Sequence, residues 1–318
     1  MSMLDSFLFS ANIVLPSFIL ILLGRFITKF QLATIQEMDK LAKLTFTYVL
    51  STKIFMDVAD NDPSAFSNYS MVVFCFIMIV ALFCVIWFIA AHTLQKKESV
   101  GSFVQSCFRC SFTVLGMSMI DSFSGSEGVA KCALLLAMTA VVFNILASIV
   151  LTKHEDQVPF FARLKKTGKS IVTNPLIIAS VLGLIASYCR LQLPYIIEKP
   201  LKDIGAMAAP LSLLCIGSSL TKERIKGSFK YAAIAACVKT FGQALIVVPI
   251  AVVCGFRGFE LTVITIFFTA ANPSANYVMA LSTKSDSDLA ATGIVLSTVM
   301  CVFTSMIFIT VLRSMALI

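Results

Sequence analysis

Apolar segments of about twenty residues follow one another through the sequence, with little chain between them. A helix needs roughly 20 apolar residues to cross the hydrocarbon core of a bilayer, so 318 residues can hold about ten spans. Only 13% of the residues are charged, whereas a soluble domain carries about 25%. A chain of this kind cannot cover itself with polar surface in water. We therefore predict an all-α integral membrane protein that crosses the bilayer many times.

Clusters of polar residues set the ends of the segments to within about 2–4 residues. The ten predicted transmembrane helices are 6–25, 38–58, 69–91, 102–123, 129–151, 171–189, 201–220, 229–253, 259–282 and 288–313. The fourth and the ninth are unusually polar, since they contain Gln105 and Arg109 in one and Thr269 and Asn272 in the other. Such helices should face the interior of a bundle or a water-filled cavity rather than lipid.

The two halves of the sequence align with each other at an offset of 159 residues, which is half of the 318. The first five spans then overlay the second five, and the polar fourth span falls on the polar ninth. Because five is odd, the halves must insert in opposite orientations, a pattern typical of secondary transporters. The matching positions include Pro16 with Pro175, Gly24 with Gly183, and Leu32 with Leu191.

This pattern predicts three parts of the chain. Residues 1–151 form the first five-helix repeat, residues 152–170 form a basic cytoplasmic linker, and residues 171–318 form the second repeat. The fourth and ninth helices should be the unusual, broken helix of each half.

The distribution of basic residues predicts the orientation in the membrane. Odd-numbered connections contain 17 of the 25 Lys and Arg residues, and even-numbered connections contain six. Basic loops stay on the cytoplasmic side, so both termini should lie outside. The net charge of +8 then reflects topology and anionic lipid, and predicts no nucleic-acid partner. No basic residue precedes Arg25, so we interpret the first apolar segment as a retained span rather than a signal peptide.

Polar residues around a proline in the ninth span are the first candidates for a substrate site. Pro273 removes one backbone amide, and neighbouring side chains can satisfy the groups that the break frees. A half-helix that begins there directs its positive end toward the middle of the bilayer, where it favours an anion. An ordinary proline kink is the alternative. The predicted substrate-binding residues around the two breaks are Asn272, Pro273, Ser274, Asn276, Ser111, Thr113 and Gly116.

Three basic residues within the spans are candidates for a role in the site or at its edges. Lys239 lies about 15 Å into the eighth span, near the bilayer midplane, where it either meets an anionic substrate or is held by carbonyl groups of a broken helix. Lys53 is expected to extend to the outer interface and to pair with Asp57 at i+4. Arg109 is expected to anchor the inner end of the fourth span, with a cavity-facing position as the alternative.

Other chemical motifs are scarce. The ten cysteines lie mostly within apolar runs, and a single CxxC (Cys107 and Cys110) does not make a zinc site. The two histidines, His92 and His154, fall at span ends or in loops. We therefore predict no metal site, no cofactor and no enzymatic activity.

Several segments resemble the auxin efflux carrier family, which belongs to the bile/arsenite/riboflavin transporter superfamily. They are TNPLIIASVLGLIAS at 173–187, GAMAAPLSLLCIGSSL at 205–220, GFRG at 255–258 and FTAANPSANYVMA at 268–280. The resemblance implies a scaffold of spans 1, 2, 6 and 7 and a mobile part of spans 3–5 and 8–10, with elevator-type alternating access. It also implies possible homodimers through the scaffold. Pro273 matches the family's crossover proline, and Gly116 matches a glycine in span four.

The sequence departs from the plant members at the first crossover. Cys110-Ser111 stands where plant carriers have Pro-Asn, and Ser118 and Ser51 replace two family prolines, although Pro210 is present. The missing asparagine removes a ligand for the carboxylate of auxin, so malate-like or malonate-like substrates fit the pattern better.

These observations predict a secondary transporter of small organic anions in a plasma membrane of the bacterial inner-membrane type. The alternative is a sodium-coupled organic anion symporter of the bile-acid type. A sensor would need a signalling domain, and an intramembrane enzyme would need clustered acids or histidines. The sequence shows neither feature, so it favours a transporter over both.

Overall fold

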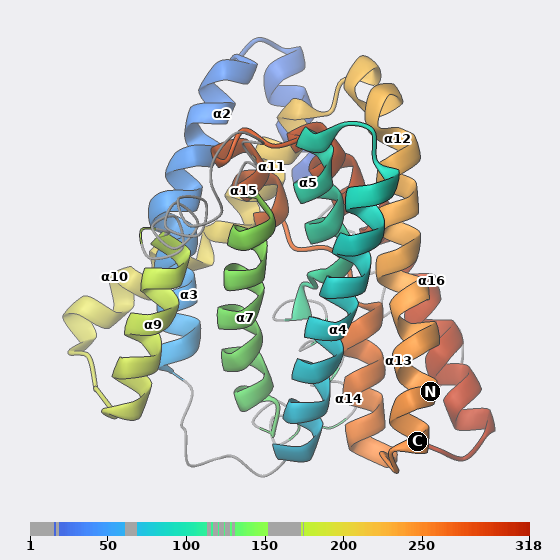
Figure 1. Cartoon of the computed structure of the whole chain (residues 1–318). Coiled ribbons are helices and arrows are strands. Elements are labelled where there is room, and N and C mark those ends of the chain that lie inside the picture. Colours follow the sequence, from blue (N-terminus) through green and yellow to red (C-terminus); the bar gives the residue numbers. More distant parts are fainter. Residues whose placement is uncertain are drawn as a thin grey trace, which may run out of the picture.

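The computed structural model describes residues 19–60, 69–112, 131–151 and 175–318, together with residues 16, 116, 120, 124, 128 and 173. These residues form helices joined by short connections, and no strand occurs among them (Figure 1). Residues 19–29 are helical. The other helices are α2 (Ile35–Leu44), the π-helix η1 (Thr45–Val49), α3 (Leu50–Ala59), α4 (Tyr69–Thr93), α5 (Lys97–Phe108), α7 (Ala133–Leu151), α9 (Pro175–Tyr188), α10 (Tyr195–Ala206), α11 (Ala208–Ser219), α12 (Lys222–Cys237), the π-helix η4 (Val238–Gly242), α13 (Gln243–Val253), α14 (Gly258–Thr269), α15 (Ala275–Ser282) and α16 (Ser287–Ser314).

The helices expose apolar side chains on the outside of the bundle. In α4, for example, Phe76, Ile77 and Phe88 are exposed, while Cys75 and Ile79 on another face are buried. A helix that is apolar all round is suited to lipid rather than water. Five helices within the described residues are long and apolar enough to cross a membrane: Tyr69–Thr93, Leu134–Leu151, Tyr195–Ser219, Arg224–Val253 and Ser287–Ser314. The all-helical membrane fold is therefore confirmed, and the count of ten spans stays a prediction.

The connections lie at two ends of the bundle. In Figure 1 the α4–α5, α11–α12 and α15–α16 connections lie at the upper end, and the α9–α10 and α13–α14 connections lie at the lower end. The first three are connections that the sequence places on the cytoplasmic side. This alternation is what a chain that crosses a bilayer repeatedly requires.

Two helices that the sequence comparison pairs end in the same way. After the helix over residues 19–29, Gln31 has a positive φ of 58° and the amide of Leu32 donates to the Ile27 carbonyl at 3.0 Å. After α9, Arg190 has a φ of 49° and the amide of Leu191 makes the equivalent bond at 2.9 Å. Both ends have the hydrogen bonds of a Schellman cap, which satisfies carbonyls that the helix leaves free. Gln31 and Arg190 are 159 residues apart, the offset found in the sequence.

Close backbone contacts hold the helices that the sequence assigns to the scaffold. A Cβ atom on Gly24 would overlap the carbonyl oxygen of Leu214 in α11. A Cβ on Gly183 in α9 would lie 2.9 Å from the carbonyl oxygen of Phe55 in α3. Glycine is needed at both positions because small residues let membrane helices approach closely.

Two helices stop partway through the bundle. Each of α5 and α14 has 12 residues, and their first residues, Lys97 and Gly258, are 161 positions apart. The breaks that follow them position the candidate site. The predicted linker, residues 152–170, lies outside the described residues.

Candidate substrate cavity at the two helix breaks

The two breaks are in direct contact. Helix α5 ends at Phe108, and Arg109 is extended with a ψ of 148°. Helix α14 ends at Thr269, and Ala270 is extended with a ψ of 146°. The backbone amide of Ser111 donates to the carbonyl of Ala271 at 2.7 Å. Backbone groups freed by one break therefore bind groups freed by the other, as burial away from water requires.

The position of the first break differs from the sequence prediction. We expected it near Thr113–Gly116, and α5 ends before that, with extended backbone beginning at Arg109. No proline marks this point, so the sequence carries no direct signal for it. The second break is at Pro273, as predicted, and α15 begins two residues later.

Side chains on both sides support the breaks. The side chain of Gln105 in α5 donates to the carbonyl of Asn276 in α15 at 2.9 Å, and the amide of Asn276 returns a bond to the carbonyl of Gln105 at 3.3 Å. The backbone amide of Asn272 donates to Ser297 Oγ of α16 at 3.1 Å. These contacts fix α5, α15 and α16 to one another.

Lys239 lies in η4 behind the breaks and is 0% exposed. Its Nζ donates to Gln243 Oε1 at 2.8 Å and to the carbonyl of Phe268 at 3.2 Å. Gln243 Nε2 in turn donates to the carbonyl of Cys107 at 2.9 Å. The last carbonyls of a helix lack partners within the helix and carry partial negative charge. Lys239 and Gln243 thus satisfy the C-terminal ends of both α14 and α5.

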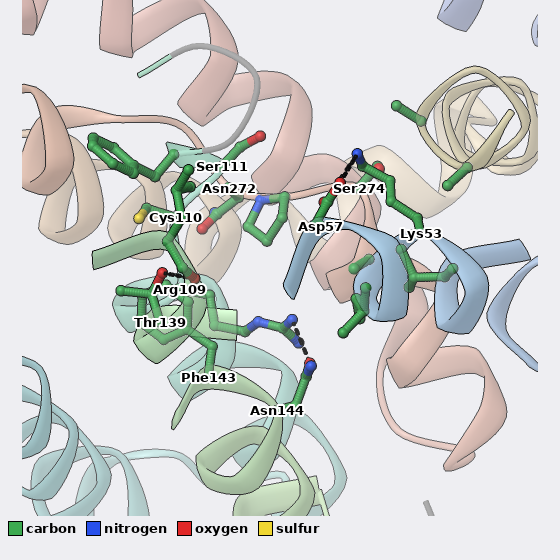
Figure 2. Close-up of a pocket in the computed structure, with 18 of the residues that line it drawn as sticks. Lys53, Asp57, Arg109, Cys110, Ser111, Thr139, Phe143, Asn144, Asn272 and Ser274 are labelled. Atoms are coloured by element: carbon green, nitrogen blue, oxygen red, sulfur yellow. Dashed lines mark hydrogen bonds and ion pairs between the residues drawn. The ribbon is translucent and has the colours of Figure 1, made fainter. Parts of the chain in front are cut away.

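A cavity of about 380 Å³ lies on the other side of the breaks (Figure 2). Its walls come from α3, α7, α11 and α16 and from the broken segments around Arg109–Phe112 and Asn272–Ala275. Most of the lining is apolar. The polar and charged lining residues are Lys53, Asp57, Asp60, Arg109, Ser111, Thr139, Asn144, Asn272, Ser274 and Thr298.

Asn272 lines this cavity with an unsatisfied polar side chain. Its side chain is buried, with the residue 3% exposed, and neither its Oδ1 nor its Nδ2 has a hydrogen-bond partner among the described residues. Buried amides in folded proteins nearly always have partners, so an orphaned one at a cavity wall indicates a ligand or water position. Ser111 and Ser274 add hydroxyl groups to the same wall.

Arg109 faces the cavity, although we expected it to anchor the inner end of the span. The residue is 5% exposed, and its Nη2 donates to Asn144 Oδ1 of α7 at 3.2 Å. Its Nη1 contacts Met279 Sδ at 2.6 Å, and its Nε has no partner. The sequence signal for this position is an arginine inside a polar span, because ionisable residues within the membrane usually have a functional role.

The charged groups on the α3 side of the cavity are paired. Lys53 Nζ lies 3.0 Å from Asp57 Oδ2, which confirms the predicted i+4 pair. Asp60 lies 3.0 Å from the ammonium of Lys202, which also binds Glu198. Figure 2 shows Lys53 and Asp57 across the cavity from Arg109 and Asn144.

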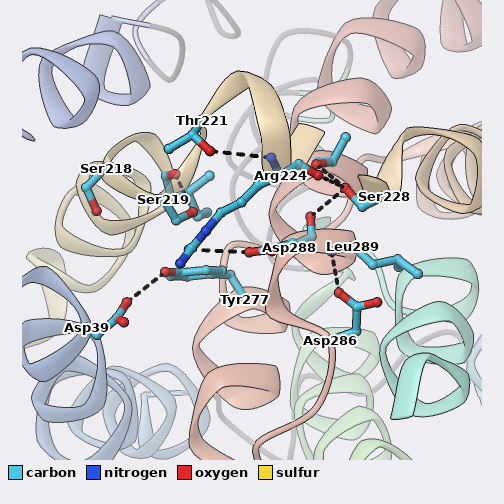
Figure 3. A network of polar contacts seen from close by, with 12 residues as sticks. Asp39, Ser218, Ser219, Thr221, Arg224, Ser228, Tyr277, Asp286, Asp288 and Leu289 are labelled. Atoms are coloured by element: carbon cyan, nitrogen blue, oxygen red, sulfur yellow. Dashed lines mark hydrogen bonds and ion pairs between the residues drawn. The ribbon is translucent and has the colours of Figure 1, made fainter. Parts of the chain in front are cut away.

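A separate polar network ties α15 to the helices behind it (Figure 3). The hydroxyl of Tyr277 donates to Asp39 Oδ1 of α2 at 3.3 Å. Arg224 of α12 forms an ion pair with Asp288 of α16 at 3.4 Å. Tyr277 and Asp39 do not line the cavity, so this contact between α15 and α2 lies away from it.

The predicted site residues thus divide into groups. Those that line the cavity are Ser111, Asn272, Pro273 and Ser274. Those described but not lining it are Gly116, Asn276 and Lys239. Thr113 lies outside the described residues. In the first turn of α15, the backbone amides of Asn276 and Tyr277 donate to the carbonyls of Pro273 and Ser274. These two amides are therefore not free to bind an anion at the start of the half-helix, although the sequence prediction assumes that they are.

The sequence matches the family described as "Membrane transport protein" over residues 9–309. The chain belongs to this membrane transport protein family. This is the auxin efflux carrier family that the sequence motifs resemble, and it makes the protein a transporter rather than an enzyme. No curated protein matches the sequence of this transporter.

The fold of the transporter is similar to that of a sodium proton antiporter from Methanocaldococcus jannaschii. The two structures superpose with a TM-score of 0.52 over 97% of this chain and 99% of the antiporter, at 13% sequence identity. At this identity the likeness concerns the fold alone. A multi-pass membrane transporter fold agrees with the long apolar helices.

Proposed function

We propose that this transporter is a secondary carrier of small organic anions, and that the carboxylate of the substrate binds in the cavity at the two helix breaks. The observation that carries the proposal is the orphaned amide of Asn272 at the cavity wall, beside Ser274 and Ser111. An amide and two hydroxyls supply the donors that a carboxylate needs after it leaves water.

The charges near the breaks favour an anion over a cation. Arg109 and Lys239 both lie there, and the lining carboxylates, Asp57 and Asp60, are already bound to lysines. A sodium ion prefers oxygen ligands with negative charge and would be repelled by two buried cations. This argues against the sodium-coupled symporter, which stays the alternative.

An elevator-type movement is the proposed mechanism, and the position of the cavity supports it. One wall comes from α3 and α11, in the predicted scaffold spans, and the others come from the breaks, α7 and α16, in the predicted mobile part. A substrate there contacts both parts, and the Tyr277–Asp39 bond joins them away from the cavity. The repeat boundaries, the outside termini and a homodimer through the scaffold remain part of this proposal. The matching caps at Gln31 and Arg190 support the internal repeat.

The proposal is tested by recording currents from the purified protein in liposomes on a solid-supported membrane. The panel consists of malate, malonate, succinate, lactate, indole-3-acetate and taurocholate, each with and without sodium and a pH gradient. We expect a saturable current with at least one acid in the absence of sodium. A current that needs sodium would favour the symporter, and no response to any acid, by current or by counterflow, would refute the anion substrate.

A further inference from the structure

We propose that Arg109 sets the charge selectivity of the cavity, so that it accepts substrates with one carboxylate and an apolar body and rejects dianions and neutral analogues. This inference rests on the proposed function, because it assumes that organic anions enter the cavity. It ranks malate and malonate below monocarboxylates, although the family resemblance favours the former.

The guanidinium of Arg109 has no counter-charge among the described residues. Its two hydrogen-bond partners, Asn144 Oδ1 and Met279 Sδ, are both neutral. An arginine stays protonated in proteins, so the charge cannot be removed by loss of a proton. A buried charge without a partner is costly, and a bound carboxylate would remove that cost.

Arg109 also keeps a donor for such a ligand. The Nε atom is buried and has no partner. Arginine binds carboxylates through two parallel N–H groups, and Nε with one Nη atom is one such pair. Asn272 and Ser111 lie on the same wall and can complete the hydrogen bonds to the carboxylate.

The α3 side of the cavity opposes a second negative charge. The carboxylates of Asp57 and Asp60 face the cavity there, and the ammonium of Lys53 is already bound to Asp57. A second carboxylate on the substrate would lie beside these acids or would have to displace Asp57 from Lys53. Both arrangements are unfavourable, because the lysines on this side are already paired with acids and leave no free ammonium there for a second carboxylate.

The remaining lining suits an apolar body. Leu50, Ile54 and Val58 of α3 face the cavity from one side, and Phe112, Phe143 and Leu136 face it from the breaks and α7. Apolar substrate surface buried against these side chains stabilises binding in proportion to its area. A compact dianion such as malonate gains little from such walls.

The experiment uses two probe sets, each of closely related molecules that carry a charge of −1, 0 or −2 at neutral pH. The first set is phenylacetate, phenylacetamide and phenylmalonate, and the second is butyrate, butyramide and succinate. Binding of each probe to the purified full-length transporter in detergent is measured calorimetrically at neutral pH. The proteins are the unchanged transporter, Arg109→Gln, Arg109→Lys, and the control Arg257→Gln, which removes an exposed arginine in the loop after α13.

We expect the monoanion of at least one set to bind about 30-fold or more tightly than its amide and its dianion. In Arg109→Gln this preference should fall to within a few-fold of one, with an unfolding temperature no lower than that of the unchanged protein, because a buried charge without a partner has been removed. Arg109→Lys should keep part of the preference for the monoanion, and Arg257→Gln should keep all of it.

Each contrary result has a distinct meaning. Preference for the dianion, or an unaltered preference in Arg109→Gln, would overturn the role of Arg109 and leave the anion carrier intact. Equal binding of amide and monoanion to the unchanged protein would also overturn it. No binding of any anion to the unchanged protein would instead refute the proposed function, and with it this inference.

Discussion

Replacing Lys239 by methionine is expected to destabilise the transporter by about 2–5 kcal/mol and to abolish transport. Methionine is an apolar side chain of similar length, so the change removes the ammonium group without opening a large space. The carbonyl of Phe268 and the Oε1 of Gln243 would each lose a donor in a fully buried site. Each unsatisfied buried group costs about 1–3 kcal/mol, and the C-terminal ends of α14 and α5 would also lose a nearby positive charge.

The measurement is thermal unfolding of the purified variant in detergent, together with its currents in liposomes. Lys199→Met is the matched control, because Lys199 is exposed and pairs with Asp203 on the surface of α10. Exposed pairs of this kind contribute about 0–1 kcal/mol, so the control should unfold near the unchanged protein. A Lys239→Met variant with unaltered stability and transport would show that the two helix ends do not need the ammonium.

Replacing Asn272 by alanine is expected to weaken binding of the transported acid by about 10–100-fold and to leave stability unchanged. The side-chain amide has no partner in the described protein, so its removal breaks no bond within the fold. The backbone bond to Ser297 stays, because it uses the amide nitrogen of the main chain. The effect of Asn272→Ala should therefore appear in substrate binding and not in the unfolding of the substrate-free protein.

Asn276→Ala is the matched control for Asn272→Ala, since it removes the same side chain four residues further along the chain. Asn276 does not line the cavity and its amide binds the carbonyl of Gln105. Its loss should lower the free energy of unfolding by about 1 kcal/mol and change the affinity little. Titration of the current against acid concentration and thermal unfolding separate the two effects. If Asn272→Ala instead lowered the free energy of unfolding and left the affinity unchanged, Asn272 would be a structural residue.

The positions of the helices follow from the sequence because they depend on local properties. Runs of apolar residues match α4, α7, α9 and α16 to within about four residues, whereas α5, α10 and α12 begin five to seven residues before the predicted spans. Pro273 marks the second break because proline removes a backbone donor. The pairing of Lys53 with Asp57 is also local, since residues four apart lie on one face of a helix.

The features of the site that the sequence does not predict depend on contacts between segments that are far apart in the chain. Helix α5 ends close to the point where the backbone amide of Ser111 donates to the carbonyl of Ala271. No residue type near Arg109 predicts that contact. The direction of Lys239 depends on η4, because a π-turn holds extra residues and rotates the side chains that follow it. Whether Lys239 faces substrate or helix ends was therefore open in the sequence, and the structure places it at the helix ends.

The central claim is that the transported acid occupies the cavity at the two breaks, and protection of Cys110 from alkylation tests it most directly. Cys110 lines this cavity, whereas Cys254 is exposed in the loop after α13. The rate at which N-ethylmaleimide modifies each cysteine is followed by mass spectrometry as the acid concentration rises. We predict that the acid slows modification of Cys110 at least tenfold, with the same half-saturation as the current, and leaves Cys254 unaffected. An unchanged rate at Cys110 with a saturating transported acid would contradict the account.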